Sequence, residues 1–211
     1  MSKIHLKDYK KKNLINYSSI IFSKKGCEII PELGLFRFGK VDLKILEYLR
    51  ENFKKVFKNL FEYIRVIEEP LEIPRNAYDS KRNQYLSPLF LHEIRIYAEK
   101  NEYDKVLGIT SLDLFVYELN FVFGQAEFGS QAKAAIISLY RLYPNFYGHP
   151  FDENLFLLRT LKEGIHEIGH TLGLEHCRNY CIMVFSNSIS DTDRKPAAFC
   201  EKCWSKIESK F

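Results

Sequence analysis

Residues 152–177 read DENLFLLRTLKEGIHEIGHTLGLEHC, and the spacing of their apolar side chains predicts one long amphipathic helix. The helical pattern begins at Asp152. Its predicted buried stripe consists of Leu155, Leu158, Leu161, Ile165, Ile168 and Leu172. Gly173 is placed to end the helix, because glycine readily adopts the left-handed conformation with which many helices terminate. The stretch therefore predicts a buried helix that carries several chemically active side chains near its end.

Three histidines and a glutamate in this stretch have the spacing of a catalytic zinc site. His166 and His170 are four residues apart, so a helix places their imidazoles one turn apart on the same face. A turn at Gly173 allows His176 to return to the same ion. Glu167 lies where its carboxylate can hold a water molecule without binding the metal. Three nitrogen ligands leave the fourth position of a tetrahedral zinc open, as in catalytic sites. Three histidines satisfied by hydrogen bonds alone is the alternative, which the specificity of the extended motif disfavours.

Four cysteines follow at the spacing of a second zinc site. They are Cys177, Cys181, Cys200 and Cys203, a C-x3-C and a C-x2-C pair separated by 18 residues. Four thiolates close the coordination sphere, so such an ion would stabilise the fold and do no chemistry. Two disulfides are the alternative, disfavoured because nothing in the sequence indicates secretion. The sequence thus predicts two zinc ions per chain. Because Cys177 directly follows His176, we expect the second ion to hold the loop that positions the first.

The motif HEIGHTLGLEH resembles that of the metzincin metallopeptidases, HExxHxxGxxH followed by a turn that contains a methionine. Met183 in CIMVF is the corresponding methionine. A cysteine directly after the third histidine and three more downstream form a pattern similar to that of the archaemetzincins. The resemblance spans roughly residues 28–205. It implies an α/β, zincin-like fold: a mixed, mostly parallel twisted sheet with an antiparallel cleft-edge strand. Helices that include the HExxH helix would pack on the sheet, beside a small C-terminal subdomain with the four-cysteine zinc.

The rest of the sequence predicts alternating strands and helices, and therefore a largely parallel sheet. Asp42 is a candidate N-cap of a helix. The further predicted elements are a strand over 61–69, a loop over 72–85, a helix over 89–100 and a strand over 105–116. Residues 120–143 contain two strand-like runs separated by about ten residues that include Gly124 and Gly129, and this pattern predicts a hairpin or an adjacent edge strand.

Composition and charge predict an ordinary globular chain. Of the 211 residues, 46% are hydrophobic, and the net charge of +4 is too slight and scattered to indicate a nucleic-acid or membrane partner. No signal peptide and no membrane span are evident. We therefore expect a cytoplasmic monomer with a single domain over residues 1–211, in which 1–25 form an N-terminal extension and 177–211 the C-terminal subdomain.

The predicted function is hydrolysis of peptide bonds in a peptide or protein substrate, with a zinc-activated water and Glu167 as general base. By resemblance, the run AAIISLYRL (134–142) would be the cleft-edge strand on which a substrate pairs, although its pattern alone favours a plain buried strand. Arg141 and Glu163 are candidate helpers that would stabilise the developing charge, and the alternative for each is a solvated or salt-bridged surface residue. A non-catalytic zinc protein that binds peptides in the same groove is the alternative function. A zinc ribbon that contacts nucleic acid through DTDRK and Trp204 is the weakest one.

Overall fold

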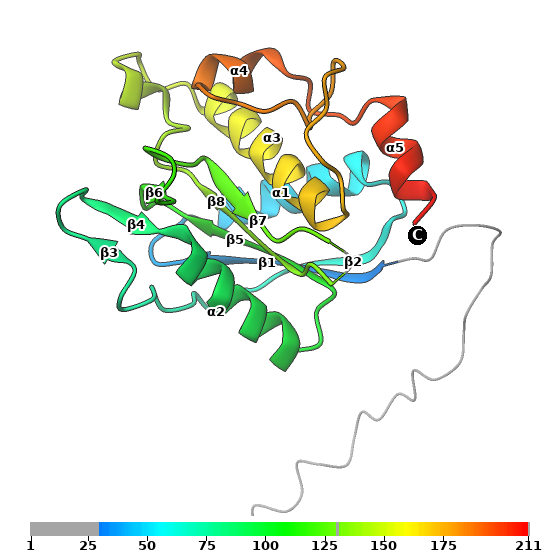
Figure 1. The fold of residues 1–211 in the computed structure, drawn as a ribbon, viewed down its shortest axis with the longest axis horizontal. Helices are drawn as coiled ribbons and strands as arrows, with labels where there is room; N and C mark the ends of the chain where they lie inside the picture. Colours follow the sequence, from blue (N-terminus) through cyan, green and yellow to red (C-terminus); the bar gives the residue numbers. More distant parts are fainter. Residues whose placement is uncertain (1–29, 130, 211) are drawn as a thin grey trace, which may run out of the picture.

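The computed structural model describes residues 30–129 and 131–210, so the predicted extension over residues 1–25 lies outside the described part. A five-stranded sheet forms the centre, with the strand order β2-β1-β5-β8-β7 (Figure 1). Its strands are β1 (Ile30–Phe38), β2 (Phe61–Val66), β5 (Lys105–Thr110), β7 (Gly124–Ala126) and β8 (Ala134–Ser138). β1, β2, β5 and β8 pair in parallel, and β7 pairs antiparallel with β8. The expected mostly parallel sheet with an antiparallel edge strand is confirmed.

Helices cover both faces of this sheet. They are α1 (Leu43–Val56), α2 (Ser87–Lys100), α3 (Glu153–Thr171), α4 (Ile189–Arg194) and α5 (Glu201–Glu208). α2 packs on one face, α1 and α3 pack on the other, and α4 and α5 lie outside α1 and α3 (Figure 1). Because the middle strand β5 is covered on both sides, all six of its residues are buried. The predicted cap of α1 is present, since the Asp42 carboxylate accepts a hydrogen bond from the Lys44 N–H at 3.0 Å.

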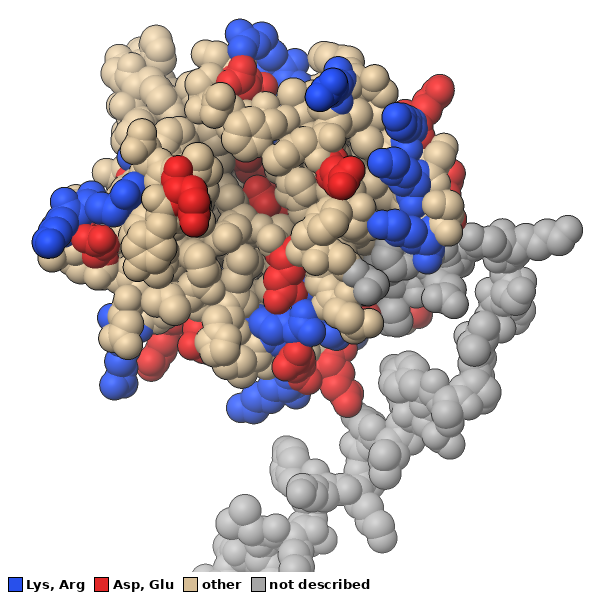
Figure 2. All heavy atoms as spheres, in the orientation of Figure 1, with Lys and Arg blue, Asp and Glu red and all other residues tan. Residues whose placement is uncertain are grey.

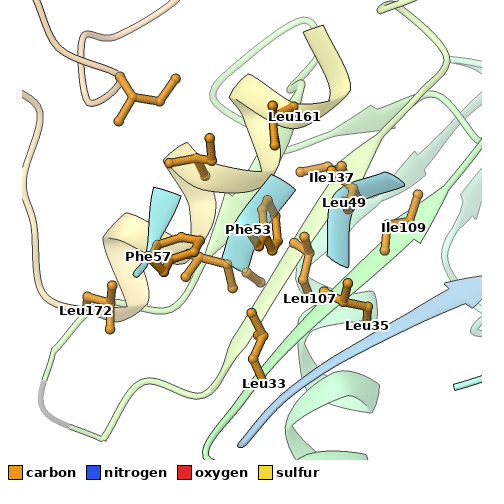
Figure 3. Packing of buried hydrophobic residues seen from close by; sticks show 14 of the residues in the cluster. Leu33, Leu35, Leu49, Phe53, Phe57, Leu107, Ile109, Ile137, Leu161 and Leu172 are labelled. Carbon is orange, nitrogen blue, oxygen red and sulfur yellow. The ribbon is translucent and has the colours of Figure 1, made fainter. Parts of the chain in front are cut away.

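The larger hydrophobic core lies between the sheet and the α1–α3 layer. Phe53 of α1, Leu107 of β5 and Leu161 of α3 meet there, together with Phe57 and Leu172, which directly follow α1 and α3 (Figure 3). The same cluster includes buried residues from the C-terminal segment, namely Cys181, Ile182, Met183, Cys203 and Ile207. Residues 177–210 are therefore packed onto the core that supports α3.

Two predictions about the middle of the chain need correction. The expected loop over 72–85 contains β3 (Tyr78–Asp79) and the start of β4 (Gln84–Leu86). The expected strand over 105–116 breaks after Thr110, and its second part is β6 (Leu114–Phe115), which joins β3 and β4 in a separate sheet. The break occurs at the polar turn of residues 111–113, where the Thr110 hydroxyl accepts a hydrogen bond from the Leu112 N–H. A single-turn 3-10 helix (Pro144–Tyr147) precedes α3.

The run 134–142 is not at the edge of the sheet, contrary to the expectation drawn from resemblance. Its strand, β8, pairs with β5 on one side and with β7 on the other, and every residue of β8 is buried. The edge strand on this side of the sheet is β7, whose three residues are only partly buried. The buried-strand interpretation of the same run was the correct one, because a strand with two partners has no free backbone groups to offer.

The buried side of α3 also differs from the predicted stripe. Leu158 is 38% exposed, whereas Phe156 is buried. From Arg159 onward α3 is enclosed by the sheet, by α1 and by α4, so that polar side chains of this part are buried as well. An amphipathic pattern predicts one buried face of a helix only, and it does not predict that α1 and α4 also bury the remaining faces. Among the described residues, none of the helices has both the length and the hydropathy that a membrane span requires.

Candidate active site and metal centres

α3 ends where its sequence predicts, and this end shapes the candidate active site. Its N-cap is Asp152, whose carboxylate accepts the Leu155 N–H at 3.0 Å. At the other end Gly173 has a φ of +79°, and the Leu174 N–H donates to the carbonyl of Gly169 at 3.0 Å. The left-handed residue turns the chain back toward the last turn of the helix. The segment that carries His176 therefore returns beside α3.

The three histidines of the motif converge on one point. Their ligand nitrogens all lie within 4.8 Å of one another. The Nε2 atoms of His166 and His170 are 3.1 Å apart, and the His176 ring centroid lies 5.4 Å and 4.9 Å from those two rings. His166 is buried and His176 is exposed, so the point of convergence opens to solvent on one side.

Hydrogen bonds fix which nitrogen of each helical histidine is free. Nδ1 of His166 lies 2.9 Å from the carbonyl of Ile182, and Nδ1 of His170 lies 2.8 Å from the carbonyl of Leu174. A carbonyl can only accept, so each Nδ1 carries the proton and each Nε2 presents a lone pair. Two lone pairs at 3.1 Å repel unless a cation lies between them. Zinc–nitrogen bonds of about 2.0–2.1 Å predict about 3.3 Å between tetrahedral ligands, so the donor set fits zinc.

Burial keeps these imidazoles in the form that binds metals. It lowers the pKa of His166 well below the ordinary value and lowers the pKa of His170 to about 4. The pKa of His176 is also lowered, again chiefly by burial. A neutral imidazole is the ligand form of histidine, because a protonated ring has no lone pair to donate.

Glu167 is buried against the edge strand of the sheet. Burial raises the pKa of its carboxyl well above the ordinary value, and the nearby charge of Glu163 raises it further. A methyl group at Gly124 of β7 would lie 2.6 Å from Oε1 of Glu167, closer than a Cβ can approach. Gly124 therefore makes room for this carboxylate, a role that the sequence analysis missed. The available signal was a glycine inside a strand-like run, which often marks a close approach.

A cleft of about 650 Å³ opens over the histidines and Glu167. Its lining includes the segment of residues 119–126 with Phe128 and the loop of residues 185–187. Phe128 and Phe185 are both exposed large hydrophobic residues of this lining. None of the described Lys and Arg residues lines the cleft. In Figure 2, Lys and Arg side chains lie mainly toward the periphery of the face, around a hollow with acidic and uncharged side chains.

The edge strand β7 presents free backbone groups beside the cleft. Phe123 and Glu127, which flank β7, hydrogen-bond with the neighbouring strand β8 at 2.8 Å and 2.9 Å. Because bonded and non-bonded pairs alternate along an antiparallel pair, the peptide groups of Gly124 and Ala126 face away from β8. Both residues line the cleft.

Met183 packs against α3 at Gly169, the residue before His170. It is fully buried, and a methyl group at Gly169 of α3 would lie 2.4 Å from its sulfur. The Met183 carbonyl accepts a hydrogen bond from the Cys177 N–H at 2.9 Å. The methionine thus packs against the helix between the two histidines that α3 carries and closes the turn that follows His176.

The four cysteines of the C-terminal segment form a second cluster. Their sulfurs all lie within 4.8 Å of one another, and the cysteines are free thiols. Sγ of Cys177 and Sγ of Cys200 are 3.8 Å apart. Zinc–sulfur bonds of about 2.3 Å in a tetrahedron predict about 3.8 Å between sulfurs, so this donor set also fits zinc.

The thiols differ in how easily they ionise. Burial acts to raise the pKa of Cys200, but hydrogen bonds from the Cys203 N–H and the Asn179 side chain bring it down to about 6. Burial raises the pKa of Cys181, and burial together with the charge of Cys181 raises that of Cys203. Several thiolates in so small a volume require a cation, because each charge disfavours the next.

The two candidate helper residues are both engaged in ion pairs. Arg141 binds Asp113 through two hydrogen bonds of 2.7 Å and 2.8 Å and does not line the cleft. Glu163 does line it, and its Oε1 lies 3.0 Å from the Lys195 ammonium and accepts a 3.0 Å hydrogen bond from Thr192. The positive charge of Lys195 acts to lower the pKa of Glu167 and of all three histidines.

The segment DTDRK therefore attaches α4 to α3. Asp193 binds Arg159 of α3 through two hydrogen bonds of 2.7 Å, and the Lys162 ammonium donates to the carbonyls of Thr192 and Asp193. Lys195 is buried, with 4% of its surface exposed. A nucleic-acid contact through this lysine is excluded by its burial.

Comparison with known proteins identifies relatives along most of the chain. The family described as Peptidase family M54 matches residues 38–209. The archaemetzincin of Pyrococcus furiosus is 42% identical over 175 residues, which are 82% of this chain and 90% of that protein. The archaemetzincin of Methanocaldococcus jannaschii is 44% identical over 174 residues, with the same two coverages of 82% and 90%.

Two crystal structures are similar to this fold. The archaemetzincin of Methanopyrus kandleri has a TM-score of 0.72 and 36% identity, and the match covers 84% of this chain and 93% of that one. The archaemetzincin of Archaeoglobus fulgidus, solved in complex with malonate, has a TM-score of 0.69 and 35% identity, with coverages of 83% and 99%.

Proposed function

Because the chain belongs to peptidase family M54, the archaemetzincins, and is a zinc metallopeptidase, we propose that His166, His170 and His176 hold its catalytic zinc and that Glu167 is the general base. The observation that carries this proposal is the pair of Nε2 lone pairs 3.1 Å apart at the floor of the cleft, beside Glu167. Three nitrogens leave one position for water or substrate.

A zinc ion held there would supply the Lewis acidity that polarises a peptide carbonyl and activates a water molecule. Glu167 accepts the proton of that water and delivers it to the nitrogen of the leaving amine. The buried position of Glu167 suits this role, because burial raises the pKa of its carboxyl well above the ordinary value and so makes it a stronger base than an exposed carboxylate. Gly124 has no side chain, so the Glu167 carboxylate can occupy the space beside it.

The substrate is proposed to bind in extended form along β7. The peptide groups of Gly124 and Ala126 face away from β8 and line the cleft, so an extended peptide can pair with them as an additional strand. The same strand supplies the glycine against which Glu167 packs. This arrangement brings the scissile carbonyl and the general base to the same edge.

Cys177, Cys181, Cys200 and Cys203 are proposed to hold a second, structural zinc. The sulfur–sulfur distance of 3.8 Å between Cys177 and Cys200 supports this ligand set. The cysteines are free thiols, which also fits the expected cytoplasmic location, where disulfides are rare. A single domain, a monomeric state and the absence of a nucleic-acid partner stay predictions, and sedimentation of the zinc-loaded protein tests the second of them.

Metal content and activity of purified protein test the proposed function together. We expect two zinc ions per chain and hydrolysis of an unblocked peptide. The His170→Ala variant should retain one ion and no activity, and His92→Ala, on the exposed side of α2, is the matched control. An active His170→Ala variant would contradict the ligand assignment. A chain with one zinc would contradict the four-cysteine site.

A further inference from the structure

We propose that the two metal centres bind their ions cooperatively, because the backbone beside the cysteine ligands positions two of the three histidines. This inference rests on the ligand sets of the proposed function and adds a physical route between them. The route runs through the carbonyl of Ile182 to His166 and through the peptide bond from His176 to Cys177.

The first connection is the hydrogen bond that orients His166. Its Nδ1 lies 2.9 Å from the carbonyl of Ile182, the residue that directly follows the cysteine ligand Cys181. Ile182 is fully buried, and its N–H donates to the carbonyl of Ala198 at 2.9 Å. Any movement of Cys181 therefore moves the acceptor that holds the His166 ring. A hydrogen-bond acceptor for the second ring nitrogen of a ligating histidine fixes the orientation of the ring and raises the affinity for the metal.

The second connection is covalent. His176 and Cys177 are neighbours in the chain, and the Cys177 N–H donates to the carbonyl of Met183 at 2.9 Å. The loop of residues 177–183 is thereby closed at its base. Its start determines where His176 lies, and its end carries both Ile182 and Met183.

This loop depends on its cysteines for its shape. It contains no helix or strand, and residues 178–180 are exposed. Sulfur atoms make several of its contacts: the Asn179 N–H donates to Sγ of Cys177 at 3.4 Å, and the Cys200 N–H donates to Sγ of Cys181 at 3.2 Å. An ion shared by the four sulfurs would fix the loop against α5. Without that ion, the sulfur contacts at 3.4 Å and 3.2 Å would hold the loop less firmly.

His170 is held in a different way and provides an internal contrast. Its Nδ1 lies 2.8 Å from the carbonyl of Leu174, in the turn that ends α3, and that turn is closed by the Leu174 N–H and the left-handed Gly173. No part of this arrangement depends on the cysteines. Loss of the cysteine ion should therefore leave one histidine in place and release two, which lowers affinity without abolishing the site.

The first experiment measures metal affinity at the histidine centre. Cobalt(II) in place of zinc distinguishes the centres, because only thiolate ligands give sulfur-to-metal charge-transfer absorption. In a chelator titration, Cys200→Ser should weaken cobalt at the histidine centre by about 10- to 100-fold, the usual effect of removing support behind a metal ligand. Ile207→Val, a buried change on α5 that removes no ligand, should leave this affinity unchanged. An unchanged affinity in Cys200→Ser would overturn the proposal.

The second experiment runs in the opposite direction and does not require a folded Cys200→Ser variant. Thermodynamic linkage requires that each ion strengthen the other by the same factor. His170→Ala should therefore weaken the thiolate-bound ion by a similar factor in the same titration, and His92→Ala should not. Equal thiolate-ion affinity in His170→Ala and wild type would refute the coupling. Neither readout uses peptide hydrolysis, so an inactive protein with coupled ions would contradict the proposed function alone.

Discussion

The histidine centre and the cysteine centre are adjacent in the chain but are built in opposite ways. The first takes two of its proposed ligands from consecutive turns of α3 and lines a cleft of about 650 Å³. The second takes its proposed ligands from a loop and from the first turn of α5, and two of its four cysteines are buried. A rigid helix with a free coordination position suits chemistry, whereas a closed shell of thiolates suits the fixing of a loop. The contrast predicts that the two centres fail differently when each is disturbed.

The largest expected effect is loss of stability when the cysteine centre is broken. Cys203 is buried in the main core, and its replacement by serine removes a proposed ligand of the structural zinc. Cys203→Ser should lower the free energy of unfolding by more than about 4 kcal/mol, as loss of a structural metal typically does. Denaturant unfolding of zinc-loaded protein measures the change. If stability stayed at the wild-type level, the cysteine centre would not be an architectural one.

Next in size is a loss of turnover that leaves the fold intact. Glu167→Gln keeps the shape of the side chain and removes its capacity to take a proton. Peptide hydrolysis should fall by about 100- to 10,000-fold, the usual contribution of a general base. Zinc content and unfolding midpoint should remain those of the wild type. Hydrolysis at the wild-type rate would remove Glu167 from its assigned role.

A smaller effect on the same centre is expected from the glycine of the edge strand. Gly124→Ala places a methyl group 2.6 Å from the Glu167 carboxylate, which must then shift. We expect kcat/KM to fall by about 100-fold or less, since a misplacement of about 1 Å has such an effect, with both metals retained. Kinetics of Gly129→Ala provide a comparison, because no atom lies within 4 Å of the added methyl group, although the left-handed backbone there makes this control slightly destabilising. Full activity in Gly124→Ala would show that the Glu167 carboxylate can work from a shifted position.

The smallest expected effect concerns the far end of the helix that carries the histidines. The Asp152 carboxylate caps α3 by accepting the Leu155 N–H, about four turns before His166. Asp152→Ala should cost about 1 kcal/mol of stability and leave the metal affinity of both centres as it was. Thermal unfolding and chelator titration together test this. A weakened histidine centre in this variant would mean that helix fraying, and not the cysteine loop, controls the site.

Much of the candidate site was predictable because it is local in sequence. His166 and His170 share a helical face by spacing alone, and Gly173 ends the helix by its conformational freedom. The four cysteines were also recognisable from their intervals. In contrast, Gly124 and Ile182 act on α3 from 43 and 16 residues away from their partners Glu167 and His166. No local pattern encodes which glycine faces a carboxylate or which carbonyl accepts a histidine proton.

The sequence by itself determined which histidines and cysteines are candidate ligands, the spacing of two of them on one helix and the alternation of strands and helices, since helical and strand periodicity depend only on neighbours in the chain. The order of the strands, the choice of β7 over β8 as the cleft edge and the burial of Lys195 beside Glu163 were decided by tertiary structure. Each depends on which surfaces meet in three dimensions. The adjacency of His176 and Cys177 is evident in the sequence. The loop that connects their two centres closes only in the folded chain.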